Sequence, residues 1–344
     1  MSKTPRPNIG DVAREAGVSN TTVSHALNGK GRVDEETRTR IAEAAQRIGY
    51  VPSRAARSLV LGKSDAIGLF LPQVANLSLH ELLSSDWYGR IVAGASQAAF
   101  ESGRVLTLLH MTCAAEEAAR LGLDGVILLD PVQDDPRKHV LLKNRLPHVL
   151  LGRDTQSSTS CTVCPDTHRA MVTLLEHLLE AGATSIALLT HDLPWDLLDE
   201  EQQTYVDWMR AHDMPAVSHT VPISESRTRE EIYQSAYKVA CAVLSAPNRP
   251  RAIIGLVEDF GPAIVAAAES LGLRVPDDLL VAQDSDGLRA QLSRPPITAI
   301  DMHPEQQVAA AVALLIEQIQ GHSVVMETRA PITLNVRGST VTRS

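Results

Sequence analysis

A short run of polar side chains near the start of the chain has the types and the spacing to read DNA. Asn20, Thr21, Ser24, His25 and Asn28 fall on or beside one face of a helix, since residues three and four apart share a face. Their amide, hydroxyl and imidazole groups donate and accept the hydrogen bonds that base edges and phosphate oxygens require. The run therefore favours a helix that enters the major groove of a duplex.

Three short helices are expected to position this run, over residues 8–17, 19–28 and 34–49. Each begins at a residue that caps helices well, and a glycine ends the first and the third. In the second helix Val23 and Leu27 are expected to point inward, which leaves the polar residues outside. Two helices joined by a tight turn form a helix-turn-helix, whose second helix presents its early residues to base edges.

The charge of the chain is divided unevenly. Residues 1–64 carry 11 Lys and Arg against 6 Asp and Glu, a net charge of +5, whereas the whole chain of 344 residues carries −9. The remaining residues therefore carry −14. A basic head attracts phosphate, and an acidic body reduces nonspecific binding to the same polyanion.

Six motifs in and after this head occur in the order and spacing of one known family. They are residues 11–19 (DVAREAGVS), 22–25 (TVSH), 27–28 (LN), 36–38 (ETR), 49–52 (GYVP) and 56–59 (ARSL). Together they resemble the lactose-repressor (LacI/GalR) family of transcriptional regulators. Within that family, residues 20–25 are most similar to the recognition helix of the purine repressor. The resemblance implies an all-α, lambda-repressor-like helix-turn-helix domain over residues 1–52.

The resemblance also assigns roles to single residues. Those that would read bases are Asn20, Thr21 and His25, and those that would hold phosphates are Asn8, Thr22, Ser24 and Asn28. Residues 53–64 would form a hinge helix and linker that contacts DNA through Arg54, Ala56 and Leu59. Leu59 would insert between base pairs, an apolar wedge of the kind that kinks DNA. The implied partner is a near-palindromic, double-stranded operator bound by a homodimer. The alternatives are a three-helix head that binds protein and a plain surface histidine at position 25.

From residue 65 onward, short apolar runs alternate with amphipathic stretches. Strands are expected within 66–71, 104–109, 125–129, 147–151, 185–189, 252–256 and 279–282, and helices within 89–102, 166–181, 230–245, 260–272 and 303–320. Uninterrupted apolar runs are typical of parallel strands buried on both faces, so the pattern predicts a parallel α/β architecture. The resemblance extends here through residues 271–278 and 295–300. It implies a periplasmic-binding-protein-like core of two lobes over residues 65–344, which dimerises and binds an effector between the lobes.

Seven residues would line that cleft by the resemblance. Trp87 and Tyr88 would stack on a ligand ring, and Arg153 would bind its polar groups. The other four depart from the residue types that the family uses; they are Glu201, Glu258, Asp259 and Ser285. The departures remove a cation and add a carboxylate, which favours a neutral or cationic ligand, or one smaller than the common sugars. An inserted stretch at residues 76–84 is expected to crowd the same region.

Alternatives remain open for this body. The pocket could hold no ligand, since a fold does not determine function, and Trp87 could be a core residue and Arg153 a salt-bridge residue. The body alone would suit a sugar-binding protein without a DNA role, which the basic head argues against. An enzyme is disfavoured, because the sequence contains no P-loop, no dinucleotide-binding glycine motif, no nucleophile elbow and no zinc-protease motif.

Cys161 and Cys164 have the spacing of a metal or redox pair. Structural zinc needs four ligands and no matching His or Cys lies nearby in the sequence, so a strand edge is the simpler interpretation, and no cofactor or metal is expected. Few cysteines, no signal peptide and no apolar run of membrane length indicate a cytoplasmic, nucleoid-associated protein. We therefore predict a dimeric transcription regulator, most simply a repressor, controlled by a small-molecule effector such as a sugar or a related metabolite.

Overall fold

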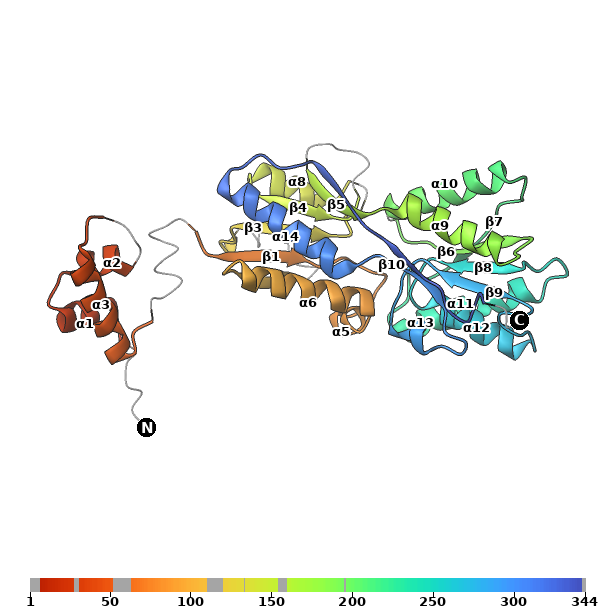
Figure 1. Ribbon diagram of the computed structural model, residues 1–344, viewed down its shortest axis with the longest axis horizontal. Coiled ribbons are helices and arrows are strands. Elements are labelled where there is room, and N and C mark those ends of the chain that lie inside the picture. The colour runs from red at the N-terminus through yellow and green to blue at the C-terminus, as the bar shows by residue number, and fades with distance from the viewer. Residues whose placement is uncertain are drawn as a thin grey trace. The chain divides into compact units, whose positions relative to one another are not determined.

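The structure of the chain, a computed structural model, describes residues 7–27, 31–51, 63–109, 120–132, 134–153, 160–194 and 196–341. Contacts divide the chain into two compact units, Met1–Asp65 and Ala66–Ser344. Figure 1 shows the first as a small group of helices and the second as strands flanked by helices.

The first unit is a three-helix domain. Its helices are α1 (Ile9–Ala16), α2 (Asn20–Leu27) and α3 (Glu35–Ile48), which confirms the three predicted helices. The side chains of Asn8 and Asp34 accept hydrogen bonds from first-turn amides of α1 and α3, and Gly17 ends α1 with a left-handed φ of 67°. The core is made of small and branched side chains, namely Val12, Ala13, Ala16, Val23, Ala26, Ile41, Ala44 and Ala45. Val23 is fully buried as predicted, and Leu27 packs at the margin of this core.

The second unit contains two six-stranded sheets among its described residues. The first sheet has the order β11-β5-β4-β3-β1-β2, and the second has the order β12-β10-β9-β8-β6-β7. Neighbouring strands run parallel except for β10 and β12. The strands are β1 (Ala66–Phe70), β2 (Val105–Leu109), β3 (Gly125–Leu129), β4 (His148–Leu151), β5 (Cys161–Pro165), β6 (Ile186–His191), β7 (Val217–Val221), β8 (Ala252–Gly255), β9 (Leu280–Gln283), β10 (Thr298–Asp301), β11 (Glu327–Ala330) and β12 (Thr333–Asn335).

Helices cover these sheets and define two lobes. The helices are α5 (Leu79–Leu83), α6 (Asp86–Glu101), α8 (Pro136–Lys143), α9 (Thr167–Glu180), α10 (Asp196–Ala211), α11 (Arg229–Leu244), α12 (Phe260–Ser270), α13 (Leu288–Leu292) and α14 (Pro304–Gln320). We call residues 66–165 with α14 and β11 the first lobe, and residues 166–301 with β12 the second lobe. The chain therefore passes between the lobes after β5, after β10 and after β11.

The central strands are buried on both faces. In β1, Ile67 and Leu69 share a core with α6 and α14, whereas Phe70 packs with Leu141 of α8 on the opposite face. In the second lobe, Leu189 of β6 joins the same core, and the alternate residues of β6 pack against α9 and α10. This period of two explains why these strands read as uninterrupted apolar runs.

The predicted parallel α/β core is confirmed, with differences at its margins. The sequence did not indicate β7, β10, β11 and β12, nor α5, α8, α10 and α13. Residues 161–164, interpreted as a strand edge, instead belong to β5, which pairs with β4 on one side and β11 on the other. Cys161 and Cys164 are buried there as free thiols. Across the described ranges, no helix is both long and apolar enough to cross a membrane.

Candidate functional sites

Helix α2 presents a polar face to solvent. Asn20, Thr21 and His25 are exposed and Ser24 is half-buried, while Val23 lies in the core. Exposure thus separates the polar from the apolar side chains as the spacing predicts. An amide, a hydroxyl and an imidazole displayed on one short helix suit hydrogen bonding to base edges.

The predicted phosphate-binding residues Asn8 and Thr22 lie at the beginnings of helices. Asn8 Oδ1 accepts hydrogen bonds from the backbone N of Gly10 (2.8 Å) and of Asp11 (3.3 Å). Ser19 Oγ accepts one from the backbone N of Thr22 at 3.1 Å. Helix N-termini carry partial positive charge and favour phosphate. Because the oxygen of Asn8 caps α1, its side-chain amide NH₂ is the group left for a phosphate.

His25 lies against a glycine. Gly31 has a φ of 71°, and a Cβ atom at this position would approach the Nδ1 of His25 to 2.7 Å. Any larger residue at Gly31 would therefore both strain the backbone and displace the imidazole. The remaining residues predicted to contact DNA lie outside the described residues; they are Asn28, Arg54, Ala56 and Leu59.

A cavity of about 160 Å³ lies within the second unit. It is lined by residues that follow parallel strands, such as Asp130 after β3, Arg153 after β4 and Asp284 after β9. Open parallel sheets bind ligands at these carboxyl ends. All seven residues predicted for the effector line it, namely Trp87, Tyr88, Arg153, Glu201, Glu258, Asp259 and Ser285. Their role toward a ligand stays a prediction, but the structure brings them together.

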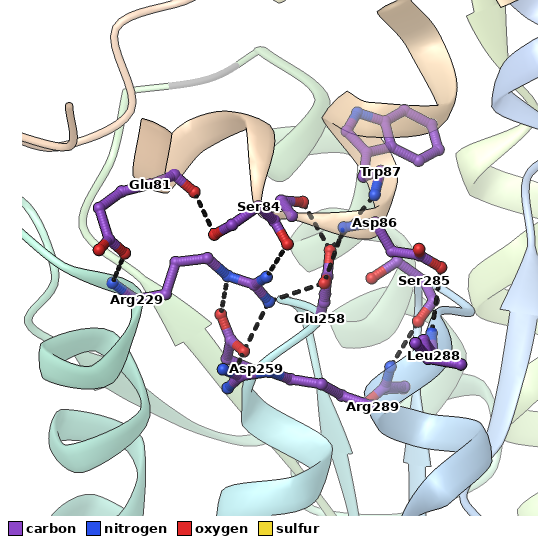
Figure 2. Close-up of polar contacts among 12 residues, drawn as sticks. Glu81, Ser84, Asp86, Trp87, Arg229, Glu258, Asp259, Ser285, Leu288 and Arg289 are labelled. Atoms are coloured by element: carbon purple, nitrogen blue, oxygen red, sulfur yellow. Dashed lines mark hydrogen bonds and ion pairs between the residues drawn. The ribbon is translucent and has the colours of Figure 1, made fainter. Parts of the chain in front are cut away.

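A buried arginine that the sequence did not single out organises one wall of the cavity. Arg229, the first residue of α11, donates from Nη2 to Glu258 at 2.7 Å and to Asp259 at 2.7 Å, and from Nε to Asp259 at 3.0 Å. Figure 2 shows its guanidinium between these two carboxylates. Burial alone would lower the pKa of Arg229, but the two carboxylates outweigh this effect and raise the pKa. The guanidinium therefore stays charged.

This ion cluster also joins the lobes. Arg229 donates from Nη1 to the carbonyl oxygen of Ser84 in the first lobe, at 2.6 Å. Glu258 of the second lobe accepts from Ser85 Oγ at 2.6 Å and from the backbone N of Asp86 at 3.1 Å, at the N-terminus of α6. A carboxylate at a helix N-terminus is favoured by the helix dipole. Arg229 and Glu258 therefore hold the two lobes together by polar contacts.

The inserted stretch predicted at residues 76–84 forms part of the same connection. It contains α5, and the backbone N of Asn76 donates to the carbonyl oxygen of Ser226 at 2.8 Å. The backbone N of Arg229 donates to the side chain of Glu81 at 2.9 Å, and Figure 2 shows this contact beside the ion cluster. Leu77 and Leu82 of the insertion line the cavity. The insertion thus closes one side of the cavity, which confirms that it crowds this region.

A second group of carboxyls faces the cavity without an arginine. Burial raises the pKa of Glu201 well above its ordinary value, and the negative charges of Asp284 and Glu200 raise it further. Burial likewise raises the pKa of Asp284 to about 7, although hydrogen bonds involving Ser285 act in the opposite direction. Two acids with raised pKa values in one cavity are typical of a binding or catalytic site.

A third acid lies on the first lobe. Tyr88 donates from its hydroxyl to Asp130 at 3.0 Å. Burial raises the pKa of Asp130 to about 6, partly offset by the hydrogen bond from Tyr88. Across the cavity, burial lowers the pKa of His191 to about 4, so this imidazole is neutral at pH 7. The hydroxyl of Tyr88 is thus engaged by Asp130, and stacking of its ring on a ligand stays a prediction.

The other predicted residues are partly engaged within the protein. Arg153 forms an ion pair with Glu200, and Trp87 is half-buried and packs against the cores of both lobes. Figure 2 shows the indole of Trp87 directed away from the ion cluster. Ser285 is half-buried, and its carbonyl oxygen accepts from Gln283 Nε2 at 2.5 Å. For Arg153 and Trp87, the salt-bridge and core interpretations therefore hold alongside their place on the cavity.

Two family models match the chain. Residues 8–53 match "Bacterial regulatory proteins, lacI family", and residues 175–340 match "Periplasmic binding protein-like domain". The head of this chain is a lacI-family head. Similar proteins include the HTH-type transcriptional regulator CelR of Thermobifida fusca, 28% identical over 97% of this chain and 96% of the relative. Another is the HTH-type transcriptional repressor PurR of Vibrio parahaemolyticus, 24% identical over 91% and 92%.

Solved structures agree with this assignment. The lac repressor dimer bound to operator and the anti-inducer ONPF matches with a TM-score of 0.84 at 21% identity, over 98% of this chain and 100% of that one. The CelR–cellobiose complex matches with a TM-score of 0.68 at 25% identity, over 97% and 100%. With its lacI-family helix-turn-helix head and its periplasmic-binding-protein-like core, this chain is therefore a DNA-binding transcription regulator.

Asp130 and Arg229 are cavity residues of the regulator that the sequence missed for different reasons. Asp130 directly follows the apolar run of β3, so its position at a strand's carboxyl end is a signal that could have found it. Arg229 has no such signal, because Arg227 two residues earlier is of the same type and local pattern does not distinguish the buried one. No group suited to a metal ion occurs in the part of the chain that the structure describes.

Replacing Arg229 with Ala tests the ion cluster. Glu258 then loses its cation and Asp259 keeps only Arg289, which contacts it at 2.7 Å. We expect the free energy of unfolding to fall by about 3–5 kcal/mol, the range for an orphaned buried charge. The control Arg274→Ala removes an arginine that pairs with Asp278 at the surface, and its loss should be much smaller because solvent screens an exposed ion pair. Urea denaturation followed by tryptophan fluorescence measures both losses, and equal losses would contradict the buried role.

The raised pKa values predict a pH dependence of stability. The lowered pKa of His191 makes stability rise between about pH 4 and 6.5, and this opposing contribution fades as the pH rises further above the unfolded pKa of about 6.5. Asp284 and Glu201, which face Glu200 and Glu258, hold protons in the folded state that the unfolded chain has released. The free energy of unfolding should therefore fall as the pH rises from about 6.5 to 8.

Two variants isolate this effect. Asp284→Asn and Glu201→Gln should each flatten the fall, because the amide has no proton to lose. Glu269→Gln removes one exposed carboxylate of the second lobe outside the cavity and should leave the slope unchanged. Urea denaturation at several pH values provides the comparison. A slope in both cavity variants equal to that of the wild type would show that these acids are ordinary.

Proposed function

We propose that this chain binds a near-palindromic operator as a homodimer, represses transcription there, and is released or recruited by a small molecule in the cavity. The observation that carries the proposal is the polar face of α2, on a head with a net charge of +5 that matches the lacI family over residues 8–53. Such a head supplies both phosphate attraction and base recognition. A sugar-binding protein without a DNA role would need neither.

The roles of single residues in the head follow from their positions. Asn20, Thr21 and His25 are the exposed polar residues early in α2 and would contact base edges. Asn8 and Thr22 lie at helix beginnings and would contact phosphate, as would Ser24 beside them. We assign residues 1–52 to DNA reading, 53–64 to the hinge and linker, and 65–344 to effector binding and dimerisation. The action of such a protein is at the nucleoid, in the cytoplasm.

The cavity would bind its ligand without transforming it. Three of its acids have partners within the protein, since Glu258 and Asp259 pair with Arg229 and Asp130 accepts from Tyr88, and these contacts position side chains for recognition. A ligand that contacts both lobes would favour one arrangement of the lobes over another. Because binding free energies are linked, this ligand and the operator must change each other's affinity by the same factor.

Selection from a random pool of duplex oligonucleotides with the full-length protein tests the main proposal. We expect enrichment of sequences with two-fold symmetry, with an affinity that falls steeply as salt rises, since each phosphate contact releases counterions. A pool from which the protein enriches no sequence at modest ionic strength would overturn the proposal. Binding of equal strength to every sequence would retain the phosphate contacts but refute base reading.

Replacing His25 with Ala tests base reading at one residue. The affinity of the dimer for the selected operator should fall by about 30-fold or more, the value of two base contacts of about 1–3 kcal/mol each, and discrimination should relax at one base position in each half-site. The control Gln46→Ala alters an exposed residue of α3 outside this face and should leave affinity unchanged. Fluorescence anisotropy with single-base operator variants measures both. Uniform weakening across all base positions would instead make His25 a phosphate contact.

A further inference from the structure

The charged groups around the cavity do not balance. Among the residues that the structure describes, carboxyl groups line it from Asp130, Glu201, Glu258, Asp259 and Asp284, whereas guanidinium groups line it from Arg153 and Arg229. Both arginines are already paired. Arg229 holds Glu258 and Asp259, and Arg153 holds Glu200. Asp130 accepts a hydrogen bond from Tyr88, so the acids left with neither an arginine nor a tyrosine partner are Glu201 and Asp284.

Glu201 is the most exceptional of these groups. It is 7% exposed and lines the cavity, and no hydrogen bond or ion pair joins its side chain to any residue within the described ranges. Its electrostatic neighbours are Asp284 and Glu200, which carry the same charge. The Oδ1 atom of Asp284 is buried and also has no hydrogen-bond partner there. A buried polar group without a partner is unfavourable, so these atoms have hydrogen-bonding capacity that a ligand could use.

The chemistry of such a ligand is restricted on several sides. An anion would meet two carboxyls and no unpaired arginine. A metal ion would need a cluster of ligands, and none of the described residues forms one. A ligand that is polar all round would face apolar side chains, since Leu77, Leu82, Ile223 and Met302 also line the cavity. A cation with N–H donors satisfies both acids, and an apolar frame on that cation fits the remaining walls.

We propose that the effector is a small organic cation, an amine on an apolar or ring frame, whose ammonium group is held between Glu201 and Asp284. This inference rests on the proposed ligand cavity, but it does not require the proposed DNA function. Ser85 and Thr167 add hydroxyl groups to the lining. Both already donate to carboxylates, of Glu258 and Glu200, so they would accept hydrogen bonds from a polar group on the frame.

Direct binding to the full-length protein tests the charge preference. The probes are two series that share a ring and differ in charge: cyclohexylamine, cyclohexanol and cyclohexanecarboxylate, and glucosamine, glucose and glucuronate. Titration calorimetry at pH 7.5 should show millimolar binding of at least one amine, as expected for a ligand of this size, and no saturable binding of the acids. The neutral members should bind at least tenfold more weakly than the amine. Calcium chloride alone serves as the test for a metal ion.

A proton readout separates a cation from a neutral ligand. Glu201 and Asp284 face each other, Glu200 and Glu258, and part of their population is protonated near pH 7. The ammonium group of cyclohexylamine, which stays charged throughout this range, should expel this proton. The observed heat should therefore depend on the ionisation enthalpy of the buffer, and the affinity for cyclohexylamine should rise between pH 6 and 8. A hydroxyl ligand hydrogen-bonded by the protonated acids should show the opposite trend.

Isosteric variants locate the site. Glu201→Gln and Asp284→Asn should each weaken amine binding about tenfold or more while the protein remains folded, because neither substitution changes side-chain volume greatly. Glu269→Gln, an exposed residue outside the cavity, should leave it unchanged. Near-ultraviolet circular dichroism confirms the fold of each variant.

Each outcome decides the inference. It is overturned if no amine binds up to about 50 mM, which corresponds to an interaction weaker than about −2 kcal/mol. It is equally overturned if glucose or an acid binds as tightly as its amine, if calcium alone saturates the site, or if both cavity variants bind the amine like the wild type. Selection of operator DNA is measured separately. Failure to find an amine preference would therefore not contradict the DNA function, and failure to select an operator would not contradict the amine preference.

Discussion

The buried guanidinium of Arg229 is the interaction on which the body of this protein depends. It lies between Glu258 and Asp259, and an arginine buried to this extent persists only where carboxylates match it. The same side chain donates a hydrogen bond to the carbonyl oxygen of Ser84 in the first lobe, so this charged cluster connects the two lobes. Because Arg229 is fully occupied by these partners, it cannot also neutralise Glu201 and Asp284. The electrostatic character of the cavity therefore follows from the way in which the lobes are joined.

This arrangement gives a ligand a physical means of acting on the whole body. Glu258 receives hydrogen bonds from the beginning of α6 in the first lobe, while the chain crosses between lobes after β5, β10 and β11. A ligand that is held by Glu201 of the second lobe and also contacts residues of the first lobe would stabilise one arrangement of this polar network more than another. An effector shifts an equilibrium only by the difference between its affinities for two states. The contacts of Glu258 and Arg229 are where such a difference would arise in this chain.

Local signals were sufficient for much of the architecture but not for the contacts within the cavity. Caps such as Asn8 and Asp34 act within one turn, and the apolar runs of β1, β3 and β6 reflect burial on both faces, so these elements could be predicted. Strand β7 has mostly exposed residues, and β11 and β12 are short and polar, so hydrophobicity did not reveal them. The ion pairs depend on chain segments far apart: Arg229 and Ser84 are separated by 145 positions. No local pattern could show that Arg229 would be occupied and Glu201 left without a cation.

The unmatched acids also bear on why this sequence has them. A buried carboxyl with a raised pKa lowers the stability of the ligand-free protein at neutral pH, and a glutamine of the same shape at position 201 would remove that penalty. Buried polar groups without hydrogen-bond partners occur mainly at functional positions, where ligand binding offsets the loss of stability. Glu201 and Asp284 come from different elements, α10 and the end of β9, yet they face one cavity. Two independent chain segments that each place an unpaired acid in one apolar-walled space are explained more simply by a shared bound partner than by two separate defects of packing.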